Sequence, residues 1–251
     1  MTLDGFVAGL IFSYFLVVAR LGSALMFMPG FGEVQIPVRA RLSFALVLCA
    51  ALLPIVKLPA AIPDGLVGMA MMLGLEVTIG LWIGLCARVL LASMQFAGYQ
   101  IGQVSGLANA FGPSFGSFEG ATMVATLMLV SAVALIFATD THHIILRALL
   151  ASYDVFPPGL IMIHDLADQI VRMGAHSLYV GTAIAAPFFV MGVILNLGMG
   201  LANRLMPQLP VFFVAASMLI GFGLLIFALS MPSILEFYIL QFQEWLMGFR
   251  V

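Results

Sequence analysis

The sequence predicts an all-α integral membrane or membrane-complex protein, built from long bent hydrophobic helices and helical hairpins. Of its 251 residues, 63% are hydrophobic and only 8% are charged, whereas about a quarter of the residues in soluble domains are charged. The apolar runs are long and do not alternate with polar residues, which argues against strands. A net charge of −2 offers no electrostatic attraction for nucleic acid. Composition therefore excludes a soluble enzyme, a nucleic-acid-binding protein and a disordered chain.

Four apolar runs occupy the first half of the chain, separated by turns rich in proline and glycine. A bilayer core requires about twenty apolar residues per helix, so each run is a candidate span. The first run lacks the basic start and the cleavage motif of a signal peptide, and we expect a retained helix there. The runs cover Phe6–Met28, Leu42–Val56, Leu66–Ala87 with a helical continuation to Leu107, and Ala121–Thr139.

The second half begins with a short helix, Thr141–Ala151, and continues into a helical hairpin formed by Gly174–Asn203 and Val211–Met231. The extension Ser233–Phe249 is amphipathic, with Glu236, Gln243 and Glu244 opposite an apolar face. Hydropathy thus predicts about six spans in all, although helices that are apolar all round also occur inside large assemblies. The apolar face of the extension carries Ile234, Tyr238, Phe242, Trp245 and Phe249.

A series of glycines marks the third run. Gly98, Gly102 and Gly106 recur every four residues, a spacing that leaves one helix face without side chains and lets a neighbouring backbone approach closely. Two interpretations remain open: close helix packing, which we favour, and a smooth polar face that lines a conduit. Polar residues on or beside this face are Gln95, Ser105 and Asn109, and Gly80 with Gly84 repeats the spacing.

The segment Phe111–Gly120 alternates large aromatic residues with glycine, proline and serine, a pattern that prevents a regular helix. Irregular backbone at membrane depth survives only where protein buries it or where it lines a water-filled cavity. The three phenylalanines could close a pore by filling it and excluding water, or they could simply anchor a loop between helices. The residues concerned are Phe111, Pro113, Phe115 and Phe118.

Ionisable residues inside the spans are costly and usually face a partner or an aqueous path. Arg20 and Glu76 are such residues, and we favour an ion pair, or hydrogen bonds to a neighbouring subunit, over a proton relay. Cys49 and Cys86 both lie within apolar runs. We therefore expect two small buried side chains and no disulfide scaffold.

The sequence contains no HExxH motif and no P-loop motif. His142 and His143 are adjacent, and adjacent residues on a helix point about 100° apart, so we do not expect them to share one ion. Asp140 fits a helix N-cap, with His143 in the first turn and Arg147 one turn further on. We expect no catalytic residue, no cofactor and no metal site.

The order of these motifs resembles that of the FliR family, whose counterpart in injectisomes is SctT. The most specific match is the stretch Arg204–Phe212, which together with Gly221 resembles the family signature R-x-x-P-Q-L-x-V-F. Pro210 stands where many members carry Asn, and the Phe-rich segment lacks an Asp-Pro. The resemblance covers essentially the whole chain and also includes Arg20, Pro29, Pro37, Arg41, Gly98, Gly102, His143, Pro158, Gly159, Ala186 and Pro187.

The resemblance implies a non-enzymatic core subunit of a type III protein export gate, flagellar or injectisome, in the bacterial inner membrane and the flagellar basal body. Such subunits assemble with FliP-like and FliQ-like partners into a closed channel for unfolded flagellar or secreted proteins, next to FlhB-like and FlhA-like proteins. Residues 1–172 would be FliP-like and 173–251 a FliQ-like hairpin, with a plug at 109–120. The tip of the hairpin would carry Arg204, Pro207, Gln208 and Pro210.

A small secondary transporter is the alternative function. It would require inverted repeats and paired broken helices around a site near the bilayer midplane. The break at Phe111–Gly120 has no counterpart in the second half of the chain, which disfavours this alternative. A membrane enzyme lacks a catalytic constellation.

Overall fold

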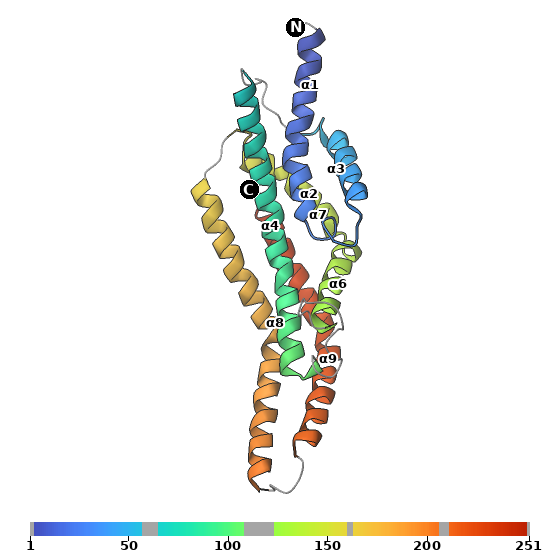
Figure 1. Ribbon diagram of the computed structural model, residues 1–251, viewed down its shortest axis with the longest axis vertical. Coiled ribbons are helices and arrows are strands. Elements are labelled where there is room, and N and C mark those ends of the chain that lie inside the picture. Colours follow the sequence, from blue (N-terminus) through green and yellow to red (C-terminus); the bar gives the residue numbers. More distant parts are fainter. Residues whose placement is uncertain (1–2, 57–64, 108–122, 160–162, 206–210, 250–251) are drawn as a thin grey trace. The chain divides into compact units, whose positions relative to one another are not determined.

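The computed structural model describes residues 3–56, 65–107, 123–159, 163–205 and 211–249 (Figure 1). Every regular element within these ranges is a helix, and none of them is a strand. The all-α class predicted from the long apolar runs is therefore confirmed.

The N-terminal helical stretch changes its hydrogen-bonding register midway. Helix α1 (Leu3–Val17) passes into a π-helix, η1 (Val18–Gly22), and then into α2 (Ser23–Phe27), and the residues that flank η1 keep right-handed helical dihedral angles. The chain leaves α2 at Met28, which is extended (φ −64°, ψ 133°). Helix α3 (Val38–Leu52) then starts directly after Pro37, whose ring prevents it from continuing a preceding helix.

Helix α4 (Leu66–Val104) continues for 39 residues through the predicted third run. Helices α6 (Met123–Ala138) and α7 (Thr141–Val155) follow and are bent by 78° at the break between them.

The C-terminal part consists of two long helices, α8 (Ile163–Leu205) and α9 (Val211–Met247), each of which contains an internal proline, Pro187 or Pro232. The amphipathic extension continues α9 without a break. Its predicted faces are confirmed, because the aromatic side chains of Tyr238 and Phe242 are buried while Glu236 and Glu244 are exposed.

Among the described residues, four helical stretches are long and apolar enough to cross a membrane: Val7–Phe27, Leu66–Val104, Asp165–Leu205 and Ala215–Met247. The bent pair α6–α7 makes five if it is taken as one span. This number replaces the six expected from hydropathy. The difference is α3, whose 15 residues reach only about 22 Å at 1.5 Å per residue, short of a hydrocarbon core of about 30 Å.

The residues group into two compact units. Unit 1 comprises 1–89, 136–173 and 242–251, and unit 2 comprises 90–135 and 174–241. The FliP-like and FliQ-like division at residues 172 and 173 stays a prediction, since it concerns sequence relationship rather than compactness.

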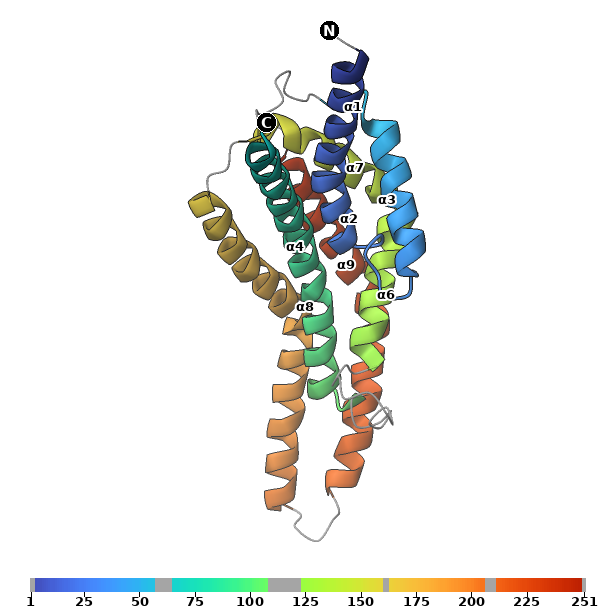
Figure 2. The same cartoon turned by 45° about the horizontal axis from the view of Figure 1, so that its top comes forward.

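In unit 1, α1 lies beside α3, as Figures 1 and 2 show, and the Tyr14 hydroxyl donates to the Leu46 carbonyl at 3.0 Å. Trp82 lies between the rings of Phe156 and Phe249, with centroids at 5.7 and 6.3 Å. In unit 2, α8 and α9 run side by side (Figure 2).

Candidate functional site

The predicted plug, with Phe111, Pro113, Phe115 and Phe118, lies outside the described residues, as does Asn109. The same holds for Pro207, Gln208 and Pro210 at the predicted hairpin tip. Arg204 is described, and it is exposed in the last turn of α8. The described part of the candidate site is therefore the pair of helices that flank residues 108–122.

Gly98 brings these two helices into backbone contact in unit 2. A Cβ atom added to Gly98 would lie 2.5 Å from the Cα and 2.9 Å from the backbone nitrogen of Ala125. Gly98 belongs to α4 and Ala125 to α6. A glycine is required at this position because any side chain would force the two backbones apart.

The glycine series does not continue along the helix to Gly106. Helix α4 ends at Val104, and Gly106 follows in a left-handed conformation with φ +72°, which favours glycine. Gly102 is buried, while Gln95 is exposed at the surface of the chain. Gly106 thus ends the helix, and Gly98 and Gly102 are the members of the series that lie on it.

Three further glycines of unit 2 approach α4 closely, and the sequence analysis missed them. Added Cβ atoms would lie 2.9 Å from the Ser93 carbonyl for Gly181, 2.5 Å from Val104 Cγ1 for Gly192 and 2.5 Å from Ser105 Cβ for Gly223. These glycines are isolated rather than spaced by four residues, so the spacing rule could not identify them. Together with Gly98, they let α6, α8 and α9 pack against the C-terminal end of α4.

In unit 1, Gly80 and Gly84 allow α4 to pack closely against the N-terminal helices. A Cβ atom on Gly80 would collide with the Ser23 hydroxyl and the Arg20 carbonyl, and one on Gly84 would lie 2.7 Å from the Ala24 carbonyl. The backbone of α4 therefore touches η1 and α2 directly.

One turn before Gly80, a fully buried ion pair joins the same elements. Arg20 Nε donates to Glu76 Oε2 at 2.6 Å, and Arg20 Nη2 donates to Glu76 Oε1 at 3.0 Å. Both side chains have 0% exposure. The expected ion pair is thus formed within this chain, and its two-pronged geometry suits a planar guanidinium.

The Arg20 guanidinium also contacts two residues of α7. Its Nη1 donates to the Ser152 carbonyl at 3.1 Å, and its carbon lies 4.1 Å from the centre of the Tyr153 ring. The Tyr153 hydroxyl is buried without a hydrogen-bond partner in the structure. Arg20, placed by the π-helix, therefore ties three segments of unit 1 together: η1, α4 and α7.

A second polar cluster holds the turn after α2. Arg88 Nη1 donates to the Glu33 side chain at 2.7 Å, and Arg41 Nη2 donates to the Glu33 carbonyl at 2.6 Å. Gly30, with φ +85°, lies so close to Phe137 that an added Cβ would be 2.8 Å from its ring. These contacts give Glu33 and Arg41 structural partners that the sequence did not reveal.

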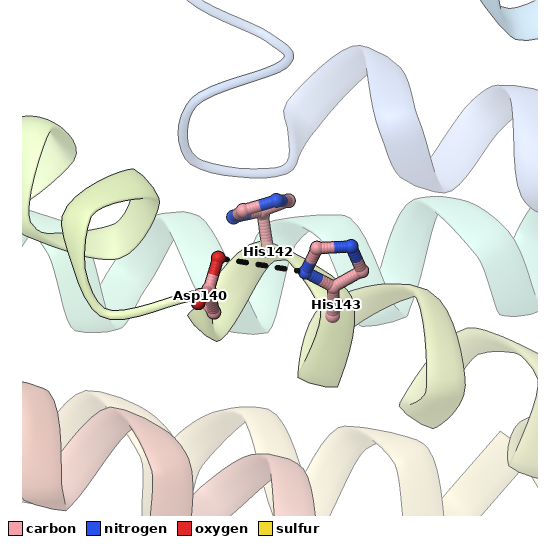
Figure 3. Close-up of side chains that lie close together, drawn as sticks. All are labelled: Asp140, His142 and His143. Carbon is pink, nitrogen blue, oxygen red and sulfur yellow. Dashed lines mark ion pairs between the residues drawn. The ribbon is translucent and has the colours of Figure 1, made fainter.

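Asp140 occupies the N-cap position of α7, but it differs from the expected cap. Its φ is +56°, in the left-handed region, and its side chain makes no capping hydrogen bond. The neighbouring rings of His142 and His143 do not diverge as expected either, because their centroids are only 4.1 Å apart. Figure 3 shows the carboxylate beside both imidazoles, with Asp140 Oδ1 3.8 Å from His143 Nδ1.

Comparisons with known proteins show the family to which this chain belongs. The model of the bacterial export proteins, family 1, matches residues 11–245. The chain is 36% identical to the flagellar biosynthetic protein FliR of Caulobacter vibrioides, over 92% of this chain and 93% of the relative. It is 28% identical to FliR of Aquifex aeolicus over 100% of this chain and 95% of that protein.

A further relative belongs to a secretion system. The secretion system apparatus protein SsaT of Salmonella typhimurium is 29% identical over 66% of this chain and 65% of the relative. Together with the four to five apolar helices, these matches identify a multi-pass protein of the bacterial inner membrane. The chain belongs to the bacterial export proteins, family 1.

Proposed function

We propose that the chain is a core subunit of a flagellar or related type III protein export gate. The family and the relatives support a role as a component of a flagellar or type III export apparatus. In the proposal, the chain assembles with FliP-like and FliQ-like subunits, contacts FlhB-like and FlhA-like proteins, and helps to form a channel for unfolded flagellar or secreted proteins. The chain acts without catalysis and without a cofactor.

The observation that carries the gating part of the proposal is the contact between Gly98 and Ala125. It joins the helix before residues 108–122 to the helix after them. Gly106, directly past the end of α4, turns the chain into this segment. A segment that opens and closes a path needs a fixed base, and these two helices supply it.

Within this segment we assign the plug to Phe111, Phe115 and Phe118. Their rings supply apolar bulk that excludes water, and Pro113 with the neighbouring glycines prevents a stiff helix that could not move aside. At rest the rings block the path, and during export the segment is displaced.

Exposed apolar side chains support the need for partners. Leu197, Leu201 and Leu205 near the end of α8 are 65%, 63% and 80% exposed, and Leu229 on α9 is 73% exposed. In the proposal, partner helices cover these side chains, and lipid covers the remainder.

An export assay tests the proposed function. Deleting the gene should abolish secretion of flagellar or other type III substrates, and the wild-type chain supplied in trans should restore it. Normal secretion in the deletion strain would contradict the proposal. A transporter would instead show a defect in the uptake of a small solute with secretion intact.

A further inference from the structure

The break between α6 and α7 brings together three side chains that can donate to a metal ion. One donor atom each from Asp140, His142 and His143 lies within 4.8 Å of the other two (Figure 3). All three residues belong to unit 1 and follow one another within a single turn of the chain. The cluster therefore contains two imidazole rings and one carboxylate.

Asp140 occupies the N-cap position of α7 without a capping hydrogen bond, and its carboxylate belongs to this cluster. A left-handed conformation is unfavourable for a residue other than glycine, and here it brings no capping hydrogen bond. The backbone carbonyl of Asp140 accepts from the His143 amide at 3.0 Å, which fixes the turn. The carboxylate is left beside the imidazoles, 81% exposed and able to rotate.

His142 supplies the second, independent observation. Its Nδ1 atom is buried and has no hydrogen-bond partner in the structure, and buried polar atoms normally have one. Its ring is held between His143 at 4.1 Å and Phe137 at 5.4 Å. A metal ion bound through this nitrogen would satisfy it.

We propose that Asp140, His142 and His143 form a site for a borderline divalent metal ion such as Zn²⁺. Two imidazoles with one carboxylate suit zinc, cobalt or nickel rather than magnesium or calcium, which prefer oxygen donors. Three protein ligands leave a coordination position open for water or a further donor.

The geometry needs only a small adjustment. In a tetrahedral zinc site with metal–ligand distances of about 2.0–2.1 Å, neighbouring donors are about 3.3 Å apart, so the donors must close by up to about 1.5 Å. His143, whose side chain is 63% exposed, is free to make this movement. The positive end of the α7 dipole opposes a cation, and the Asp140 carboxylate offsets that effect.

A titration of the untagged, purified protein in its complex tests the proposal, and it is independent of export. We expect one Zn²⁺ per chain by equilibrium dialysis and elemental analysis, and Co²⁺ should give the visible absorption of a site with mixed nitrogen and oxygen donors. Asp140→Gly removes the carboxylate yet favours the observed φ, so the turn is retained. This variant and His142→Gln should each weaken binding at least about tenfold, because even the loss of an outer-shell partner costs about 10–100-fold.

His176→Gln is the matched control, because His176 lies on α8 in unit 2, beside Tyr179 and apart from the cluster in sequence. It should bind Zn²⁺ like the wild type. No stoichiometric binding by the wild type, or equal loss in the control and the cluster variants, would overturn the proposal.

Discussion

At the scale of single residues, the pairing of Arg20 with Glu76 makes a sharp prediction about stability. Replacing Arg20 with Leu leaves an unpaired buried carboxylate, and removing one partner of a buried ion pair costs about 3–5 kcal/mol. Replacing both residues with Leu should recover much of that loss, because no buried charge is left. Thermal unfolding of assembled complexes that carry the single or the double variant measures the difference.

The exposed pair Arg172 and Asp168 is the control for this cycle. Its atoms are 2.7 Å apart, but the side chains are 78% and 53% exposed, and exposed pairs contribute about 0–1 kcal/mol. Arg172→Ala should therefore barely change the unfolding temperature. If Arg20→Leu is equally mild, the buried pair does not tie η1 to α4 as we describe.

Cys49 makes a prediction that depends on pH. Burial raises the pKa of its thiol from 9.0 to about 11, so the folded protein keeps the thiol protonated. Because the folded state disfavours the thiolate, the resulting stability is present below about pH 9 and is lost as pH rises toward 11. In a Cys86→Ala background, maleimide should label Cys49 poorly at pH 7 and fully after denaturation in detergent. Rapid labelling of the folded protein would show that Cys49 is not buried.

At the scale of helices, Gly98 and Gly74 of α4 form a matched pair. Gly98→Ala places a methyl group against the Ala125 backbone and should destabilise the protein by about 1–3 kcal/mol through overpacking. Gly74 has no atom within 4 Å of an added Cβ. Gly74→Ala should therefore be neutral or stabilise the helix by up to about 1 kcal/mol. The unfolding temperature and the yield of assembled complex are measured for both variants. Equal effects of the two substitutions would contradict the contact between α4 and α6.

Much of this architecture could be predicted from local patterns. Runs of apolar residues predicted the helices, and Pro37 and the glycine-rich turns predicted where several of them begin or end. The close approach at Gly98 could be predicted because a small residue acts through its own missing side chain. These are properties that a short stretch of sequence carries by itself.

Features that depend on distant segments could not be predicted in the same way. Arg20 and Glu76 are 56 residues apart, and nothing local shows that their helices are neighbours. Gly181 and Gly223 lack a repeating spacing, so only the packing reveals their role. Asp140 was expected to cap α7, but its backbone is left-handed and its side chain makes no capping hydrogen bond.

At the scale of the whole molecule, the exposed apolar helices predict dependence on partners. Only 17% of the most apolar window in α9 is buried within the chain, so most of that helix needs lipid or protein to cover it. We expect the isolated chain to aggregate in mild detergent and to become monodisperse when it is co-expressed with FliP-like and FliQ-like subunits. Size-exclusion chromatography with light scattering measures both states. A folded, monodisperse chain on its own would contradict this expectation.

The central claim is that residues 109–120 close the channel at rest, and the resting conductance of assembled complexes tests it most directly. Deleting 111–118, or replacing Phe111, Phe115 and Phe118 with Ala, removes the apolar bulk that would exclude water. The complex should still assemble, because the base formed by α4 and α6 is unchanged, and its conductance in a planar bilayer should rise well above that of the wild type. Assembled complexes whose conductance stays at the wild-type level would contradict the claim, as would a deletion that prevents assembly while Phe-to-Ala complexes remain closed.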